Sequence, residues 1–241
     1  SIVEYFVENL SEINPASGTL YSNWTPFHMA AQKGYLDIVE YYLEQLPMAN
    51  KNPGLSSSTF KLPGETPLHL AARKGHLSIV KHFVANLNDI NPAAGALYLT
   101  PFHFAALNGH LNVVEYYLEQ LPMTNKNPGL NTSDVRSQGL TPLHIAAGKG
   151  YLNIVQTITK YLTNTNPEGE NGCTVLHTAV LYNQLPVVKY LVANLDDNNP
   201  TTCDYYDEYG AIIGYGYSPL HIAAYEGHLN IVQFFVENLG E

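Results

Sequence analysis

The stretch Thr141-Pro142-Leu143-His144-Ile145-Ala146-Ala147 decides the fold, because the chain repeats it. Close copies of this starter motif begin at five other positions: Thr25, Thr66, Thr100, Thr174 and Ser218. Successive starts lie 41, 34, 41, 33 and 44 residues apart. A motif that recurs at this period predicts an array of stacked units, in which neighbouring units stabilise one another and no single globular core is needed.

Each starter motif has the features of a helix start. The hydroxyl of Thr141 can accept a hydrogen bond from a backbone N–H of the first turn, and Pro142 at the first helical position needs no N–H. Gly150 follows and suits the left-handed residue that ends a helix. A second apolar pattern then has helical spacing, as in residues 36–43. Each unit is therefore predicted to be a helix, a tight turn, a second helix and a connector.

These residues resemble the ankyrin repeat, whose signature is a Thr-Pro-Leu-His start, two alanines, a Gly-His pair and an Ile/Val-Val pair. The match recurs from about residue 1 to residue 239. The resemblance implies an all-α solenoid of stacked antiparallel helix pairs, with connectors that project as β-hairpin or loop fingers. In that family the fingers and the first helices usually line a concave groove, and most members recognise proteins without chemistry of their own.

We expect one array over residues 1–241, with a leading half repeat at residues 1–13 that matches a second helix without its first. The chain also stops directly after a second helix, and apolar residues such as Ile2, Phe6 and Phe235 remain at both ends. Terminal repeats normally carry a polar outer face. We therefore expect a fragment of a longer array, with an unusual natural cap as the alternative, and uncapped ends that favour end-to-end self-association.

Charge and composition narrow the class of partner. The formal net charge is −10, which argues against nucleic acid because cationic contacts to phosphates supply much of that affinity. No secretory signal and no apolar run long enough to span a bilayer is present. The two cysteines, Cys173 and Cys203, form neither a disulfide framework nor a metal-binding spacing. A reducing, cytoplasmic setting is expected, and three glycosylation sequons are interpreted as chance matches.

The ten histidines do not indicate a catalytic or metal site. Six belong to the starter motifs and three follow the turn glycine, so they are spread along the array instead of gathered in one place. The resemblance implies that they are hydrogen-bonding struts at helix starts and between repeats. No nucleophile–base pair, phosphate-binding glycine loop or His-Glu-x-x-His pattern occurs. We expect no enzyme activity, no cofactor and no bound metal.

The candidate partner-binding residues fall into two groups. Exposed tyrosine and tryptophan are enriched at protein interfaces, and the residues before the starter motifs and at finger tips include Tyr21, Trp24, Tyr98, Leu99, Tyr215 and Tyr217. The ends of the first helices carry Lys33, Arg73, Lys74, Asn108, Lys149 and Tyr182. This stripe, basic in its N-terminal two-thirds, favours an acidic or C-terminal peptide. The alternatives are that the aromatic residues pack on neighbouring fingers and that the stripe is merely solvated.

Several positions depart from the family pattern. Asn23 and Tyr98 stand where the family usually has a finger glycine, which leaves the finger geometry there open. In the fifth repeat Asn183 replaces the turn glycine, and asparagine tolerates the left-handed conformation better than most residues. The connector 196–217 is acidic and rich in tyrosine. The alternatives are a partner-contacting hairpin, an inconsequential insertion, and weak calcium binding by its carboxylates, whose spacing matches no known calcium loop.

Two functions follow from this sequence. The first is a protein-protein interaction module that binds a partner polypeptide in the groove. The second is a structural spacer or elastic segment of a long array, without a specific groove ligand. The spacer is favoured by a near-verbatim internal duplication, in which residues 36–55 recur as residues 111–130. Recognition is favoured by the divergent aromatic residues of the fingers.

Overall fold

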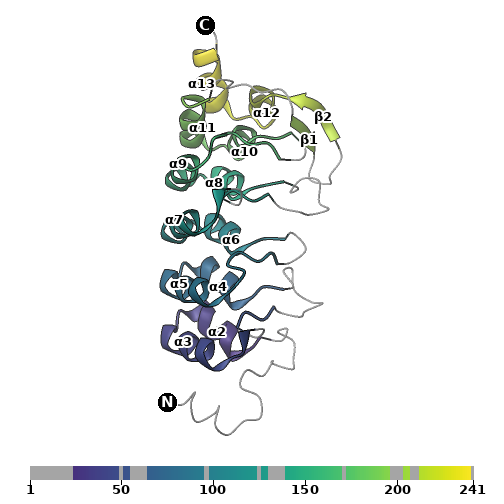
Figure 1. The fold of residues 1–241 in the computed structure, drawn as a ribbon. Coiled ribbons are helices and arrows are strands. Elements are labelled where there is room, and N and C mark those ends of the chain that lie inside the picture. The colour runs from purple at the N-terminus through teal and green to yellow at the C-terminus, as the bar shows by residue number, and fades with distance from the viewer. Residues whose placement is uncertain are drawn as a thin grey trace. The chain divides into compact units, whose positions relative to one another are not determined.

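The structure, a computed structural model, shows a mostly helical chain in which helices follow one another in pairs (Figure 1). The contacts divide it into two compact units, Ser1–Val113 and Val114–Glu241. The residues described are 24–48, 51–54, 64–94, 98–123, 126–129, 139–169, 172–195, 203–206 and 212–239. The expected half repeat at residues 1–13 lies outside them.

In the unit Ser1–Val113, the first helices of successive repeats pack against each other, α2 on α4 and α4 on α6. The second helices α3 and α5 also pack together. The helix bounds are α2 Pro26–Lys33, α3 Leu36–Gln45, α4 Pro67–Lys74, α5 Leu77–Asn86 and α6 Pro101–Leu107. The helix α7, Leu111–Gln120, contains the boundary between the two units.

The unit Val114–Glu241 repeats this arrangement. The first helices pack in the order α8, α10, α12, and the second helices pack in the order α9, α11, α13. Their bounds are α8 Pro142–Lys149, α9 Leu152–Thr159, α10 Val175–Leu181, α11 Leu185–Val192, α12 Pro219–Tyr225 and α13 Leu229–Leu239. All six starter motifs therefore begin a first helix, as the sequence predicts.

The starter motif satisfies the backbone donors of its own helix. At α4 the hydroxyl of Thr66 accepts from the backbone N–H of His69 at 3.5 Å, while His69 Nδ1 accepts from the backbone N–H of Thr66 at 3.2 Å. Asn52, from the preceding Asn-Pro pair, accepts from the backbone N–H of Leu68 at 3.1 Å. Pro67 has no N–H, so the groups that a helix start normally leaves unpaired are all accounted for.

Four of these histidines also join their repeat to the next. His69 Nε2 lies 3.2 Å from the carbonyl of Leu99, and the equivalent atoms of His28, His144 and His177 lie 2.9–3.2 Å from connector carbonyls. Since Nδ1 accepts from a backbone N–H, Nε2 carries the proton and donates it. The histidines after the turn add a second row, in which Nε2 of His76 lies 3.0 Å from the carbonyl of Gln32 in the repeat before.

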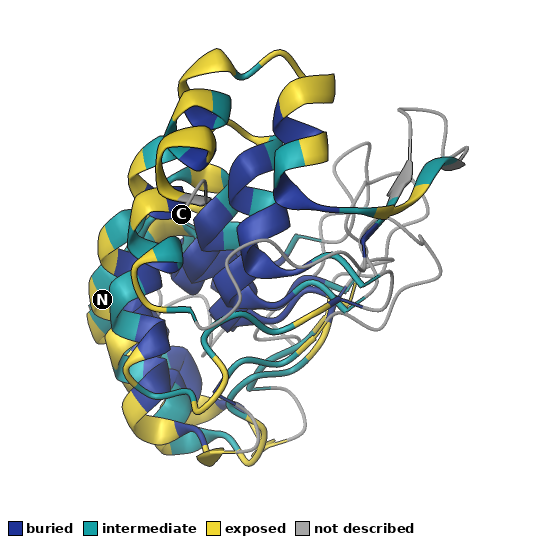
Figure 2. Cartoon of the chain, turned by 90° about the horizontal axis from the view of Figure 1, so that it is seen from above, coloured by how far each residue is buried: buried dark blue, intermediate teal, exposed yellow. Residues whose placement is uncertain are grey.

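Burial follows the repeat pattern within each unit. The buried residues, dark blue in Figure 2, gather on the facing sides of the helices, whereas the outer sides are exposed. The starter alanines are almost all buried; Ala71, Ala72 and Ala147 are fully so. Their small side chains allow neighbouring first helices to approach closely.

The tight turns have the predicted left-handed residue. Gly34, Gly75 and Gly150 have φ values of 83°, 75° and 75°. Asn183 takes the same conformation in the fifth repeat, with φ 55°. The turn is therefore preserved where the sequence departs from glycine.

The connector 196–217 contains a β-hairpin in its described part. Strand β1, Cys203–Tyr206, pairs antiparallel with β2, Ile212–Tyr217. Shorter fingers are closed by isolated antiparallel bridges, Ala94 with Leu99 and Glu168 with Thr174. The expectation of hairpin fingers is confirmed at these three places.

The prediction for the cysteines is wrong. Cys173 and Cys203 form a disulfide, with their Cα atoms 4.3 Å apart. Cys173 directly precedes the starter Thr174, and Cys203 begins β1, so the bond joins two neighbouring fingers. The 30-residue separation gave no sign of this proximity, because it depends on how the fingers stack. Disulfides persist mainly in oxidising compartments, so the pairing weighs against a reducing setting.

Lowering the pH from about 7 to about 5 is expected to destabilise the fold. Burial, as the largest cause, lowers the pKa of His28, His69 and His144 to about 4, whereas unfolded histidine titrates near about 6.5. Between these values the unfolded chain binds protons that the folded chain does not, so the free energy of unfolding falls as the pH drops through this window. By about pH 5 the loss is on the order of 1–2 kcal/mol for each histidine.

Urea denaturation at the two pH values measures this loss. A His144→Gln variant provides the control. It lacks one of the three buried histidines, so its free energy of unfolding should fall less between the two pH values than that of the wild type. Equal free energies of unfolding at both pH values would contradict the prediction.

Breaking the disulfide is expected to lower the stability of the unit that contains it. A loop of this length restricts the unfolded chain enough to contribute about 3.5 kcal/mol in the chain-entropy account. A Cys203→Ser variant should therefore unfold at a lower temperature than the wild type. Thiol labelling of the denatured, unreduced protein is the direct check, and recovery of two free thiols from the wild type would refute the pairing.

Candidate functional site

The ends of the first helices carry the candidate basic stripe. In the unit Ser1–Val113, Lys33 ends α2, Lys74 ends α4 and Asn108 follows α6. All three are exposed. Because α2 packs on α4 and α4 on α6, these equivalent positions lie on successive members of one stack. The structure therefore brings two lysines and an amide onto the same side of this unit.

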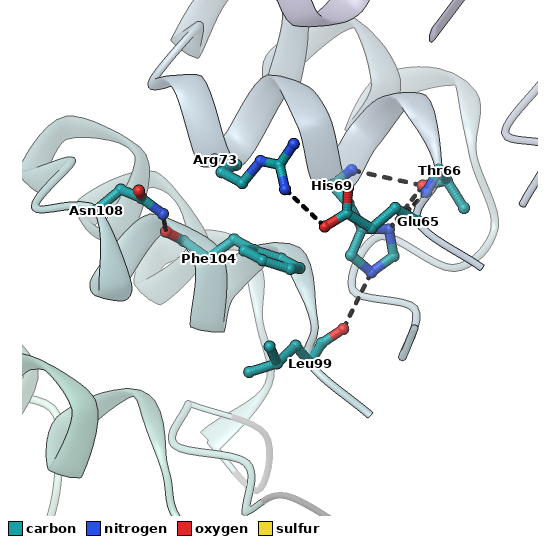
Figure 3. A network of polar contacts seen from close by, with 7 residues as sticks. All are labelled: Glu65, Thr66, His69, Arg73, Leu99, Phe104 and Asn108. Atoms are coloured by element: carbon teal, nitrogen blue, oxygen red, sulfur yellow. Dashed lines mark hydrogen bonds and ion pairs between the residues drawn. The ribbon is translucent and has the colours of Figure 1, made fainter. Parts of the chain in front are cut away.

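Arg73 lies beside this row but is not a free cation. Its Nη1 atom is 2.9 Å from Oε1 of Glu65, which is only 4% exposed. The guanidinium also lies over the ring of Phe104, 5.7 Å from its centroid (Figure 3). Arg73 is thus held between a finger residue and the next first helix, and it contributes less free charge to the stripe than the sequence suggests.

Burial and charge oppose each other at Glu65. Burial raises the pKa of its carboxyl group, and the nearby Arg73 guanidinium lowers it in part. Desolvation disfavours the charged form of a buried acid unless an opposite charge compensates. The Arg73 guanidinium therefore offsets part of the cost of burying the charged form of Glu65.

His69 and Leu99 complete the polar cluster of Figure 3. The His69 ring packs edge-on against Phe104, with centroids 5.9 Å apart. Leu99 is buried and its carbonyl accepts from His69. Asn108 donates its side-chain N–H to the carbonyl of Phe104 at 2.8 Å. The cluster fixes the finger that ends at Leu99 against α4 and α6.

The candidate aromatic residues of this unit differ in exposure. Trp24 is half-buried, with its ring centroid 6.3 Å from that of His28. Tyr98 is 50% exposed. Leu99 offers a carbonyl to the cluster and little side-chain surface. Tyr21 lies outside the described residues. Of these side chains, Tyr98 has the most accessible apolar surface.

The remaining candidates belong to the unit Val114–Glu241. Lys149 is exposed at the end of α8. Tyr182 is exposed after α10 and lies close to Gly148, where an added Cβ would be 2.9 Å from its ring. Tyr215 in β2 is 74% exposed. Tyr217 is half-buried and stacks on His221, with ring centroids 5.6 Å apart.

Glu65 and Lys126 form contacts between elements that were not predicted from the sequence. The pairing of Glu65 could have been suspected from Arg73, which follows eight positions later, at the other end of α4. Lys126 is buried, donates to the carbonyl of Leu118 and lies over the ring of Tyr161 at 4.6 Å. Its sequence context differs little from that of the other connectors, so its burial could not be anticipated.

The described histidines act as the struts that the resemblance implies. Starter histidines cap helices, and four of them donate to connector carbonyls. Nε2 of His82 lies 3.0 Å from Oε1 of Glu40. Among the residues described, no group of three His, Cys, Asp or Glu side chains lies close enough together to hold a metal ion. In the same part of the chain, no helix combines the length and apolar character needed to cross a membrane.

Comparison with known families accounts for this arrangement. The family model for ankyrin repeats, which spans three copies, matches residues 1–94, 42–128, 68–168, 102–204 and 158–241. The chain belongs to the ankyrin repeat family. Ankyrin repeats are in general protein-interaction modules and are typically non-catalytic. No curated protein matches the chain.

Removing the Arg73 side chain from this ankyrin array is expected to be costly. The buried Glu65 carboxylate would lose its counter-charge, and an Arg73→Ala variant should lose about 2 kcal/mol of stability, a figure reduced for the partial exposure of the arginine. The double variant Glu65→Gln/Arg73→Ala should recover part of this loss, since no uncompensated acid remains. Chemical denaturation of the single and double variants measures the coupling, and strictly additive losses would show that the pair is not coupled.

Proposed function

We propose that this ankyrin array is a non-catalytic recognition module that binds a partner polypeptide through a groove lined by its first helices and fingers. The observation that carries the proposal is the row of exposed Lys33 and Lys74 on stacked first helices, in the same unit as the exposed ring of Tyr98. Cations beside an accessible aromatic ring suit a polypeptide surface with both charge and apolar character.

The charge of the row favours an acidic partner. The chain as a whole has a formal net charge of −10, with 11 Lys and Arg residues. Exposed lysines on stacked first helices form a local positive patch on a chain of net negative charge. Such a patch would attract an acidic segment and orient its approach. Lys149 offers an equivalent charge in the second unit. Arg73 adds little, because Glu65 already neutralises it.

The fingers supply further candidate contacts. Tyr215 on the hairpin of β1 and β2 and Tyr182 after α10 are both largely exposed. Tyrosine offers a large contact area at a low cost in side-chain entropy. Trp24 and Tyr217 are half-buried against histidines, and we assign them a smaller part in partner contact.

A second candidate function is a structural spacer without a groove ligand. The near-verbatim repetition of residues 36–55 at residues 111–130 favours it. So does the outer side of α13, where Leu229 is 66% exposed and Val236 is 62% exposed. Such apolar surface would suit end-to-end association with another ankyrin array. A spacer would not require exposed lysines and tyrosines on the inner helices and fingers.

Charge reversal of the lysine row distinguishes the two functions. Short random peptides displayed on phage are selected against the wild-type chain, and the recovered peptides are measured by titration calorimetry. The double variant Lys33→Glu/Lys74→Glu should weaken binding by about tenfold or more, and added salt should weaken wild-type binding, because the contacts are charged.

The matched control places the same charge change elsewhere. A Lys81→Glu/Lys160→Glu variant changes two exposed lysines of second helices, one in α5 and one at the end of α9, and should bind like the wild type. Failure to select any peptide, or equal loss of binding in both variants, would defeat the groove proposal and favour the spacer.

A further inference from the structure

One finger of the array places a tyrosine where four other fingers have glycine. Two residues before the starter motif stand Gly64, Gly139, Gly172 and Gly216, with φ values of 88°, 74°, 75° and 65°. Tyr98 occupies the same place in the third finger and takes φ 52°. The finger geometry that the sequence left open is thus the same as in the others, with a side chain in the left-handed region.

This conformation costs Tyr98 free energy that glycine does not lose. For residues with a Cβ atom the left-handed region is strained, and a bulky residue there is uncommon. Tyrosine also lacks the short polar side chain that helps Asn183 adopt φ 55°. Tyr98 is therefore a strained residue at a position for which glycine is well suited.

Few contacts in the described structure offset the free-energy cost of this conformation at Tyr98. Its side chain is half-exposed, and within the described ranges no hydrogen bond, ion pair or ring contact engages it. The chain around it is nevertheless held firmly. The carbonyl of Leu99 accepts from His69 Nε2 at 3.2 Å and from the backbone N–H of Ala94 at 2.9 Å. These bonds hold the backbone next to Tyr98, so the point from which its side chain leaves the finger is fixed.

We infer that Tyr98 determines the specificity of the surface that carries the lysine row, Lys33 and Lys74. Its ring receives an apolar side chain of a bound peptide, and a neighbouring acidic side chain of that peptide pairs with Lys74. This inference rests on the proposed recognition function. Backbone strain persists where surrounding contacts hold the strained conformation in place, and strained residues are concentrated at binding sites. A finger backbone held in place before binding loses little freedom on contact, which lowers the entropic cost of binding.

The position of Tyr98 relative to α4 supports this pairing of contacts. Leu99, the next residue, is bonded to His69 of α4, and α4 ends at the exposed Lys74. The other cation at this helix end, Arg73, is engaged by Glu65 and Phe104. Lys74 is therefore the available charge at the end of the helix to which the Tyr98 finger is tied.

Three substitutions separate strain from recognition. Tyr98→Gly removes both the ring and the strain, Tyr98→Ala removes the ring but keeps a Cβ atom, and Tyr98→Phe keeps the ring. The probe is a fluorescein-labelled peptide recovered from the phage selection on the wild-type chain. Its affinity is measured by fluorescence anisotropy, and the thermal unfolding of each variant is recorded alongside.

Tyr98→Gly is expected to unfold about 2 °C above the wild type, because strain is relieved, and to bind the peptide about tenfold more weakly. Tyr98→Ala should bind equally weakly without that gain in stability, and Tyr98→Phe should bind nearly as well as the wild type. Replacing the acidic residues of the peptide should cancel the effect of Lys74→Glu.

The outcomes distinguish this inference from the proposed function. Peptides that depend on Lys33 and Lys74 but bind Tyr98→Gly as tightly as the wild type would overturn the role of Tyr98 and leave the recognition function standing. A Tyr98→Gly variant no more stable than the wild type would overturn the argument from strain. Failure to recover any lysine-dependent peptide would remove both.

Discussion

The structure depends on the histidine in the first turn of each first helix, as His69 illustrates. Nδ1 of His69 accepts the backbone N–H of the capping Thr66, and Nε2 donates to the carbonyl of Leu99 in the connector to the next repeat. One imidazole ring therefore closes a helix end and fixes the following finger. Both ring nitrogens are occupied only in the neutral form, since protonation of Nδ1 would remove its acceptor. Burial lowers the pKa of His69 to about 4 and preserves that form at neutral pH.

This division of roles leaves other positions open to variation. The backbone N–H groups of a helix start are satisfied by Thr66, His69 and the Asn-Pro pair of the connector, and Pro67 has none. The ends of the first helices and the finger residues therefore carry little of the fold. Lys33 and Lys74 occur at such positions. The same freedom lets the array place Tyr98 in a left-handed conformation, because the bonds of Leu99 on its C-terminal side hold the finger in place. The residues proposed to bind a partner are thus ones that the repeat does not need.

Interactions that join repeats modify the simple picture of a charged stripe. Arg73 is neutralised by the buried Glu65 and packed over Phe104. It therefore stabilises the finger more than it adds to the surface charge. Lys126 is likewise buried, over the ring of Tyr161. A count of basic residues overestimates the free charge of the array, and the exposed lysines at the helix ends are the better guide to the partner.

The sequence by itself determined the helices, the turns and the family, because each signal lies within a few residues. Thr141 with Pro142 begins a helix, Gly150 ends one, and the recurrence of this motif predicts stacked pairs. It also predicted the lysine row, since equivalent positions of stacked helices share a side. Only the tertiary structure decided that Cys173 pairs with Cys203, that Glu65 holds Arg73, and that Tyr98 keeps the glycine conformation. These features depend on where each finger rests against its neighbour, and connectors of varying length and composition do not encode that placement locally.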